Sequence, residues 1–343
     1  MKVPEYLPAS QWSRFSANTR PGQWVPDPLG PGYQYTTLDF GVDDEGPAVG
    51  TLVRYQPAWQ LRELLARPKG AVLSLHGWSD YFYNRELAGF WHRQGYRFYA
   101  LDLRRYGRSL RPEHELAGYT DNLAEYDAEI NASYDLIRQE HPKLPILFMG
   151  HSLGGLVLSL WAQRTSRPIA GLVLNAPWLE FQGTQFLRVP AQGLLESLVK
   201  RSPRRRLHLP ELDNYWTSLS REAHGEWDLH PLWRPRHAFK PTTGWLKTVL
   251  DGHATVAKGL GLEQPVLVLT SEQSHFGAVY DPLMQRTDSI VDVNLVRLRS
   301  LKLGNFVTNV MIHEAMHDVF TSAEPARSVA YRDLALWVRM LPR

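Results

Sequence analysis

Short apolar runs alternate with segments of helical periodicity along most of this chain. Residues 71–75 and 98–103 form two such runs, each bounded by glycine or polar residues. Between them, residues 86–94 carry three large apolar side chains at the spacing of one helix face and end at Gly95. Short, continuously apolar runs are typical of buried parallel strands. We therefore expect a strand–helix–strand unit with a right-handed crossover.

The same alternation extends over the rest of the chain, apart from one long interruption. The other expected strands are residues 36–40, 50–55, 145–149, 169–174, 265–269 and 306–312. The other expected helices are residues 122–140, 153–163, 291–302 and 325–340. The first two strands meet through the turn-rich residues 43–47, which predicts an antiparallel edge. The whole pattern predicts the α/β class, with a mostly parallel eight-stranded sheet and helices on both faces.

The interruption lies between residues 178 and 262, where no strand pattern is clear. This stretch is rich in Pro, His and Arg and holds four tryptophans, Trp216, Trp227, Trp233 and Trp245. We interpret it as a largely helical cap inserted into the core. The expected division is residues 1–178 for the first part of the core, 179–262 for the cap insertion and 263–343 for the second part of the core.

Composition narrows the class of protein. Of the 343 residues, 43% are hydrophobic and 21% are charged, which is ordinary globular usage. The net charge of +3 is mild and does not indicate a nucleic-acid partner. The absence of cysteine excludes disulfides and thiolate chemistry. Because we see no signal peptide and no apolar run of membrane-spanning length, we expect a cytoplasmic protein.

One motif carries candidate chemistry, the run Gly150-His151-Ser152-Leu153-Gly154. In Gly-x-Ser-x-Gly, the serine occupies a sharp turn between a strand and a helix, where larger side chains two residues away would collide. The motif alone is common, but here an expected strand precedes it and an expected helix follows. We therefore predict that Ser152 is a catalytic nucleophile.

A serine hydroxyl becomes nucleophilic when a histidine accepts its proton and an acid orients that histidine. In folds with this motif the chain order is Ser, then Asp or Glu, then His. His317 follows the last expected strand and precedes the last helix, so we predict that it is the base. His313 is the competitor, although it lies nearer the strand and is equally consistent with a packed or surface histidine.

The acid is expected after the strand at residues 265–269, where the candidates are Asp281, Asp288 and Asp292. We favour Asp288. Asp292 begins an expected helix, and an N-cap or first-turn aspartate there explains it equally well.

An oxyanion hole requires two backbone N–H groups. Leu153, directly after the nucleophile, is one expected donor, and Trp78, in the loop after residues 71–75, is the other. His76 in the same loop is expected to hold the loop in place and not to act in catalysis.

A rival motif lies at His313-Glu314-Ala315-Met316-His317, which matches the zinc-binding helix pattern His-Glu-x-x-His. It predicts a zinc metalloprotease if the stretch is helical and a third ligand, such as Glu324 or Asp333, lies nearby. Residues 306–312 instead predict the final strand of the sheet, which disfavours this interpretation.

Four segments together resemble the monoacylglycerol lipase, lysophospholipase and serine aminopeptidase branch of the α/β-hydrolases, over about residues 70–180 and 262–343. They are Leu75-His76-Gly77-Trp78-Ser79-Asp80-Tyr81, Leu101-Asp102-Leu103-Arg104-Arg105-Tyr106-Gly107-Arg108-Ser109, Gly150-His151-Ser152-Leu153-Gly154-Gly155 and Met316-His317-Asp318-Val319-Phe320. The resemblance implies the α/β-hydrolase fold.

The same resemblance also implies site residues. It implies Ser152 as nucleophile, His317 as base, and Trp78 with Leu153 as the oxyanion hole. Asp288-Ser289-Ile290-Val291-Asp292 is similar to the family's Asp-x-apolar-apolar-Asp segment, whose first aspartate is catalytic. In this chain residues 271–287 separate that aspartate from the preceding strand, which is a departure from the family pattern.

The expected activity is hydrolysis of a carboxylic ester such as a monoacylglycerol or lysophospholipid, through an acyl-serine and with no cofactor. The expected binding partner is therefore a small-molecule acyl ester substrate. A weak contact between the cap and a membrane surface is also consistent with the sequence. Basic residues at 200–206 are consistent with a phosphate site or with a solvated loop. One alternative is a serine aminopeptidase that uses Glu180, Glu196 or Glu211 to bind an amino terminus, and another is an inactive binding protein of the same fold.

Overall fold

The computed structural model describes residues 19–57, 67–181, 199, 201–210 and 212–341. Its described residues form one nine-stranded sheet with the order β1-β2-β3-β5-β4-β6-β7-β8-β9. The strands are β1 (Val25–Pro26), β2 (Tyr33–Asp43), β3 (Gly46–Tyr55), β4 (Gly70–Leu75), β5 (Tyr96–Asp102), β6 (Ile146–His151), β7 (Gly171–Asn175), β8 (Val266–Ser271) and β9 (Val307–Ile312). β1 to β3 pair antiparallel, as does β3 with β5, and all other neighbours are parallel.

The mostly parallel sheet is confirmed, with nine strands where eight were expected. The additional strand is β1, which pairs with β2 through Val25 and Tyr35. Two residues are too few to produce an alternating pattern, and they lie in a segment rich in Pro and Gly. The expected edge hairpin is present, and its two strands meet at Asp43 and Gly46.

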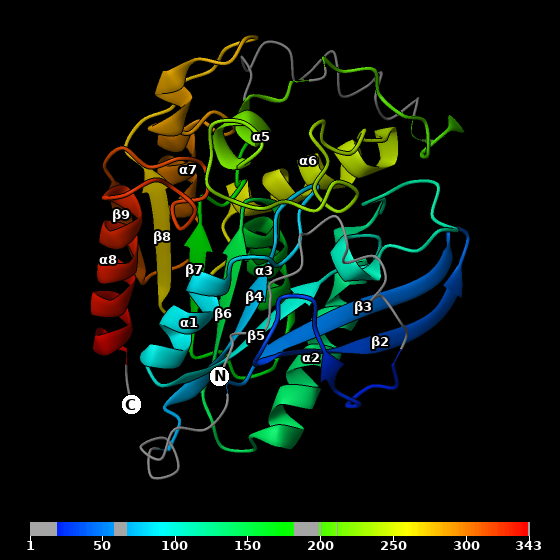
Figure 1. Ribbon diagram of the computed structural model, residues 1–343, viewed down its shortest axis with the longest axis vertical. Coiled ribbons are helices and arrows are strands. Elements are labelled where there is room, and N and C mark those ends of the chain that lie inside the picture. Colours follow the sequence, from blue (N-terminus) through cyan, green and yellow to red (C-terminus); the bar gives the residue numbers. More distant parts are fainter. Residues whose placement is uncertain (1–18, 58–66, 182–198, 200, 211, 342–343) are drawn as a thin grey trace.

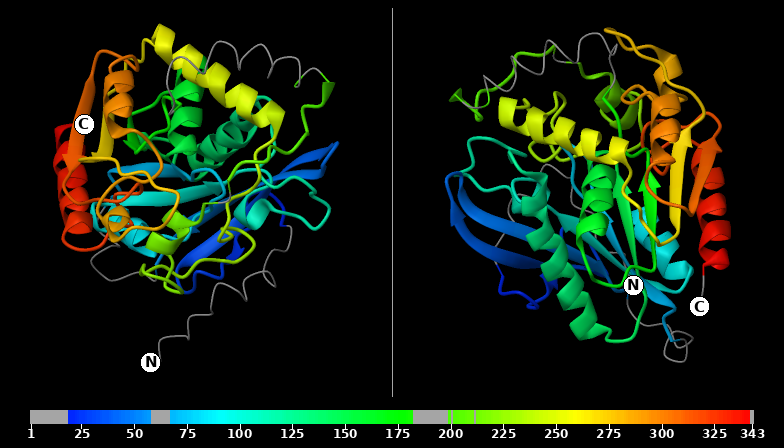
Figure 2. Two further views of the ribbon diagram at one scale, coloured as in Figure 1. Left: turned by 90° about the horizontal axis from the view of Figure 1, so that it is seen from above. Right: turned by 180° about the vertical axis from the view of Figure 1, so that it is seen from behind.

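Helices cover both faces of the sheet, as expected. They are α1 (Arg85–Arg93), α2 (Asp127–Glu140), α3 (Leu153–Arg164), α5 (Asn214–Leu219), α6 (Thr243–Lys258), α7 (Val293–Ser300) and α8 (Ala326–Met340). The described residues also form the short 3₁₀ turns η2 (Gly107–Ser109), η3 (Leu123–Tyr126) and η4 (Pro282–Gln285). α1 and α8 cover one face of the sheet (Figure 1), and α2 and α3 cover the other, which is turned toward the viewer in the right-hand view of Figure 2.

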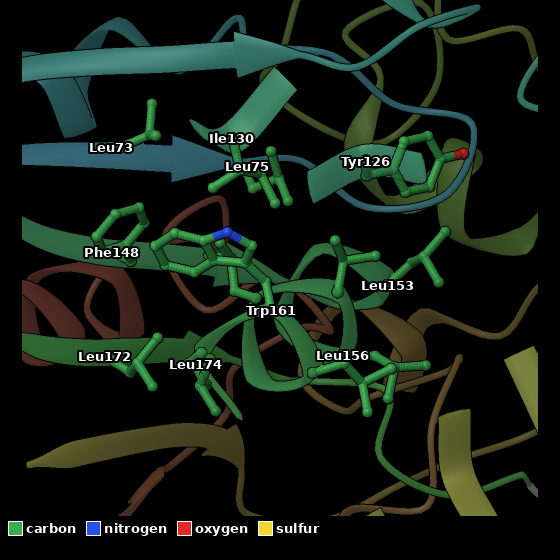
Figure 3. Close-up of a cluster of buried hydrophobic side chains, with 14 of the residues drawn as sticks. Leu73, Leu75, Tyr126, Ile130, Phe148, Leu153, Leu156, Trp161, Leu172 and Leu174 are labelled. Carbon is green, nitrogen blue, oxygen red and sulfur yellow. The ribbon is translucent and has the colours of Figure 1, made fainter. Parts of the chain in front are cut away.

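Two apolar clusters hold the layers together, one on each face. Successive residues of the central strands alternate between them: Val72 belongs to the cluster under α1 and α8, whereas Leu73 belongs to the cluster under α2 and α3. This alternation follows from the two-residue period of a strand. Figure 3 shows the second cluster, in which Trp161 of α3 packs beside Phe148 of β6.

The described part of the interrupting segment contains α5 and α6. α6 lies beyond the carboxyl ends of β6 and β7 (Figures 1 and 2) and packs against α3. We expected a largely helical insertion, but turns and extended chain connect these helices. Prolines such as Pro203, Pro231 and Pro241 account for this, because proline interrupts a helix. The division into core and cap remains a prediction.

The sheet order places a topological switch point beside β4. The chain moves from β4 to β5 on one side and later to β6 on the other side. In open α/β sheets, ligands bind at the carboxyl ends of the strands at such a point. The loops that follow β4 and β6 contain Trp78 and Ser152, so both candidate residues lie there. No described helix is both long and apolar enough to span a membrane.

Candidate active site

Ser152 lies between β6 and α3 in a conformation that L-residues rarely adopt, with φ 50° and ψ −117°. The glycines around it are required by close backbone contacts. A Cβ on Gly154 would lie 2.3 Å from the carbonyl oxygen of His76, and one on Gly150 would lie 2.7 Å from that of Gly154. Small residues on both sides therefore permit the sharp turn. It leaves Ser152 7% exposed.

The structure brings together the predicted base, His317, and the predicted acid, Asp288. Nδ1 of His317 lies 2.8 Å from Oδ2 of Asp288, and both side chains are almost completely buried. Within the described part of the chain, Nε2 of His317 has no hydrogen-bond partner. Both His317 and Ser152 line the same cavity. The imidazole therefore has one nitrogen fixed by a carboxylate and the other available to a group in the cavity.

The long segment before Asp288 returns to the end of β8. Ser274 and Asp288 form a parallel bridge, and the N–H of Asp288 donates to the carbonyl of Gln273. The remaining carboxylate oxygen of Asp288 accepts from the N–H groups of Ile290 and Val291, each at 2.8 Å. The extra residues between β8 and Asp288 thus form a loop whose two ends lie side by side. Asp288 therefore lies close to the end of β8 in space, despite its distance in the sequence.

The other two candidate acids have local roles in this structure. The Asp292 carboxylate accepts from the N–H groups of Asn294 and Leu295 and caps α7. Asp281 caps η4 through the N–H of Leu283. Neither contacts His317 in the described structure.

The rival zinc motif does not form a helix. His313 and Glu314 lie in a turn directly after β9, and Glu314 has a φ of 53°. The His313 ring is largely exposed and pairs with Glu272, whereas the His317 ring is buried against Asp288. Two histidines on one helix face, which the zinc motif requires, are therefore absent from this described segment.

The loop after β4 lies against the nucleophile. A Cβ on Gly77 would lie 3.1 Å from the Cβ of Ser152, so the backbone passes directly beside it. Among the hydrogen bonds of the described residues, none uses the N–H of Trp78 or of Leu153. Both expected donors are thus available to a bound group.

His76 holds this loop in place, as expected. Its Nδ1 lies 2.8 Å from the carbonyl of Gly77, and its Nε2 accepts from the N–H of Leu103 at 3.1 Å. These partners fix the tautomer with the proton on Nδ1, because only a protonated nitrogen can donate to a carbonyl. The ring therefore ties the loop after β4 to the end of β5.

A cavity of about 140 Å³ lies above Ser152. Its walls combine aromatic and apolar side chains with charged ones, and they include Trp78, Tyr215, Trp216, Ile290, Asp80, Arg234 and Arg236. Tyr215 of α5 packs edge-on against the His317 ring, with ring centroids 5.5 Å apart. The segment between β7 and β8 therefore forms much of the cavity wall.

Sequence reasoning did not identify the buried ion pair in this wall. Nη1 of Arg234 lies 2.5 Å from Oδ1 of Asp80, and both side chains are under one-tenth exposed. Burial opposes the charge on Arg234, but Asp80, Tyr83 and Tyr215 together outweigh it, so the pKa of Arg234 lies above its usual range. No periodic pattern surrounds Arg234, so the sequence offered no signal for this pair.

Asn175 is a second residue that was missed. Its carbonyl accepts from the N–H of Ser152, and its side chain joins Asp318 at 2.6 Å and the N–H of Val319 at 3.2 Å. The carbonyl also lies 3.1 Å from Nδ1 of His151. Asn175 therefore connects the nucleophile turn to the histidine loop. The sequence did offer one signal for Asn175: it directly follows the apolar run at residues 169–174, at the carboxyl end of an expected parallel strand, where functional residues gather.

Of the carboxylates predicted for an aminopeptidase, only Glu180 lies in the described part of the chain. Glu180 is buried and pairs with Arg299. Glu196 and Glu211 lie outside the described residues.

The sequence matches a known family and several named proteins. The family model described as serine aminopeptidase, S33 (Hydrolase_4) matches residues 66–289, more than half of the chain. The chain is 22% identical over 281 residues to a monoacylglycerol lipase of Mycolicibacterium smegmatis, covering 79% of this chain and 88% of that protein. It is 32% identical over 118 residues to phospholipase YtpA of Bacillus subtilis, covering 34% of this chain and 43%, under half, of that protein.

Solved structures share the fold. The monoacylglycerol lipase of Paleococcus ferrophilus superposes with a TM-score of 0.58 at 21% identity, covering 80% of this chain and 95% of that one. A soluble variant of monoglyceride lipase from Saccharomyces cerevisiae superposes with a TM-score of 0.55 at 14% identity, covering 100% and 99%. The expected resemblance and fold are confirmed: the chain belongs to the serine aminopeptidase S33 family and has the α/β-hydrolase fold.

Proposed function

We propose that this protein is a serine hydrolase that cleaves carboxylic esters of acyl chains, with Ser152, His317 and Asp288 as its catalytic triad. The observation that carries the proposal is the buried contact between His317 and Asp288, which leaves Nε2 of His317 free in the cavity shared with Ser152. Such a contact fixes the tautomer that a general base requires. Catalytic hydrogen bonds often tighten only when substrate binds.

In the proposed mechanism, Nε2 of His317 accepts the proton of Ser152 while Oγ attacks the ester carbonyl. The N–H groups of Trp78 and Leu153 stabilise the negative charge that develops on the carbonyl oxygen. His317 then gives its proton to the departing alcohol, and an acyl-serine remains. Water next attacks the acyl-serine with the same proton transfers, and the fatty acid leaves. These steps require no cofactor.

An uncharged or zwitterionic acyl ester is the proposed substrate class. The charged residues of the cavity wall are paired, Arg234 with Asp80 and Arg236 with Asp213. Trp78, Trp216 and Ile290 add apolar area suited to an acyl chain. The names of the relatives, monoacylglycerol lipase and phospholipase, also favour this class. We further propose that residues 179–262 act as the cap that selects the acyl chain.

A panel of p-nitrophenyl esters of increasing chain length, assayed beside aminoacyl anilides, tests this proposal. We expect ester hydrolysis that Ser152→Ala reduces by at least about 10³-fold, because the nucleophile is lost. Turnover of anilides without turnover of esters would contradict the ester assignment and favour an aminopeptidase. Turnover of neither substrate class, with no covalent labelling of Ser152, would favour a binding protein.

A further inference from the structure

The loop that follows Gly77 is attached to the segment between β7 and β8 at four successive residues. The contacts are Trp78 with Trp245 (ring centroids 3.9 Å apart), Ser79 Oγ with the N–H of Phe239 (3.1 Å), Asp80 with Arg234 (2.5 Å), and Tyr81 Oη with the N–H of His230 (3.0 Å). The first of these four residues is the proposed oxyanion donor. The inserted segment therefore contacts the catalytic machinery itself as well as the cavity above it.

Ser79 is the strained member of this loop. Its φ is 52°, in the left-handed region that residues other than glycine seldom occupy, and the residue is 4% exposed. Such a conformation persists only where surrounding contacts hold it. The hydrogen bond from Phe239 to the Ser79 hydroxyl is one such contact, and it comes from an element about 160 residues away in the chain.

The backbone of Trp78 is thus fixed on both sides. On one side Gly77 lies against the nucleophile, where an added Cβ would come within 3.1 Å of the Cβ of Ser152. On the other side Ser79 is held by Phe239, whose ring also packs edge-on against Trp78 with centroids 6.0 Å apart. The Trp78 N–H lies in the peptide plane between Gly77 and Trp78, so Gly77 acts on its direction through one of the two bonds that flank this plane. Ser79 acts on it through the Cα of Trp78, because holding the next peptide plane restricts how Trp78 can turn.

We propose that Ser79 is a positioning residue for the oxyanion hole, through which the inserted segment controls the rate of the chemical step as well as access to the cavity. This inference rests on the proposed esterase function. A donor that is misplaced by a small distance loses stabilisation of the transition state while binding of the ground-state ester changes little. Loss of the Ser79 hydroxyl should therefore lower kcat with little change in KM.

The test compares Ser79→Ala and Ser79→Gly with wild type on one p-nitrophenyl ester. We expect kcat to fall by about 10- to 100-fold in both variants, below the full loss of an oxyanion donor, and KM to stay within about twofold. Affinity for an alkyl boronic acid, which forms a tetrahedral adduct with an active serine, should fall in parallel with kcat. Glycine relieves the strain at positive φ, so full activity of Ser79→Gly would overturn the role of the hydroxyl.

Thr248→Val is the matched control. The hydroxyl of Thr248 on α6 accepts from the N–H of Leu123 at 3.1 Å, so it is a bond of the same kind between the insertion and the core. We expect a comparable loss of thermal stability with unchanged kcat. Equal loss of kcat in Thr248→Val and Ser79→Ala would contradict the inference. Absence of ester turnover in wild type would instead contradict the proposed function, so the two failures are distinguishable.

Discussion

The nucleophile and the acid of the proposed triad are positioned in opposite ways. The sharp turn at Ser152 is permitted by its own neighbours in the chain, the glycines two residues to each side, and one hydrogen bond from its N–H to Asn175 is added from the next strand. Asp288 is held by long-range pairing, since its backbone joins Gln273 and its bridge partner is Ser274. The turn at Ser152 therefore requires small residues within five consecutive positions, whereas the position of Asp288 depends on a loop that closes onto the end of β8.

This difference has an energetic consequence. The turn at Ser152 is disrupted when a larger side chain overlaps with neighbouring backbone atoms. The loop that carries Asp288 is disrupted when the hydrogen bonds that join its two ends are lost. Overlap with rigid backbone leaves few ways to relax, while a loop held by several hydrogen bonds weakens stepwise. Substitutions at the nucleophile turn should therefore cost more stability than the loss of a single hydrogen bond in the acid loop.

The largest expected effect concerns the identity of the acid. Asp288→Asn should lower kcat by roughly 10³-fold or more, because an amide cannot stabilise the imidazolium or select the tautomer. Asp292→Asn is the matched control in the same segment and should change kcat by less than about threefold, since asparagine also caps a helix. Steady-state kinetics on a p-nitrophenyl ester decides between them. A large loss of kcat in Asp292→Asn, with a small change in Asp288→Asn, would instead identify Asp292 as the acid.

The next effect tests the steric turn. Gly154→Ala places a methyl group 2.3 Å from the carbonyl oxygen of His76, and we expect destabilisation by about 3 kcal/mol or more. Gly89→Ala in α1 is the control, because there the added methyl meets only the mobile end of Arg93. It should stabilise the protein by about 0.5–1 kcal/mol, as alanine favours a helix. Urea unfolding measures both. Wild-type stability of Gly154→Ala would refute the steric account.

A smaller effect tests the acid loop. The hydroxyl of Ser274 donates to the carbonyl of Val291 and accepts from the N–H of Val293. Ser274→Ala should cost about 1–2 kcal/mol, because two backbone groups lose their partner. Ser289→Ala in the same loop removes a buried hydroxyl that has no partner among the described residues, so it should be neutral. Equal losses in the two variants would show that this hydrogen bond does not hold the loop.

The smallest expected effect is a pH dependence of folding stability that arises from His151, the residue before the nucleophile. Burial lowers the pKa of His151 below its usual range, and the nearby His317 contributes in the same direction, against the opposing carboxylate of Asp318. As pH falls below about 6.5, the unfolded chain gains a proton there that the folded chain does not bind. Stability is therefore complete above this pH and declines below it. His151→Asn should reduce the slope of unfolding free energy between pH 6.5 and 5 by up to about 1.4 kcal/mol per unit, and an unchanged slope would contradict this.

The elements that could be predicted from the sequence are those set by local pattern. Residues 146–149 of β6 and the start of α3 followed from an apolar run, a glycine motif and helical periodicity, so the surroundings of Ser152 could be anticipated. Asp288 was chosen by family resemblance as well as by order. Its hydrogen bonds to Ile290 and Val291 were not visible in the sequence.

The contacts that could not be predicted join distant segments. Arg234 meets Asp80 across more than 150 residues, and Asn175 joins Asp318 at similar separation. No periodicity specifies such a pair, because each residue is set by the packing of a different element. The short strand β1 was missed for a related reason, since its two residues are defined only by pairing with β2.

The most direct test of the proposed triad is covalent labelling by a fluorophosphonate, followed by peptide mapping in a mass spectrometer. We predict a single phosphonyl group on the peptide that contains Ser152, and greatly reduced labelling in His317→Ala. Labelling at a different residue, or a protein that hydrolyses esters while Ser152 stays unlabelled, would contradict the proposal.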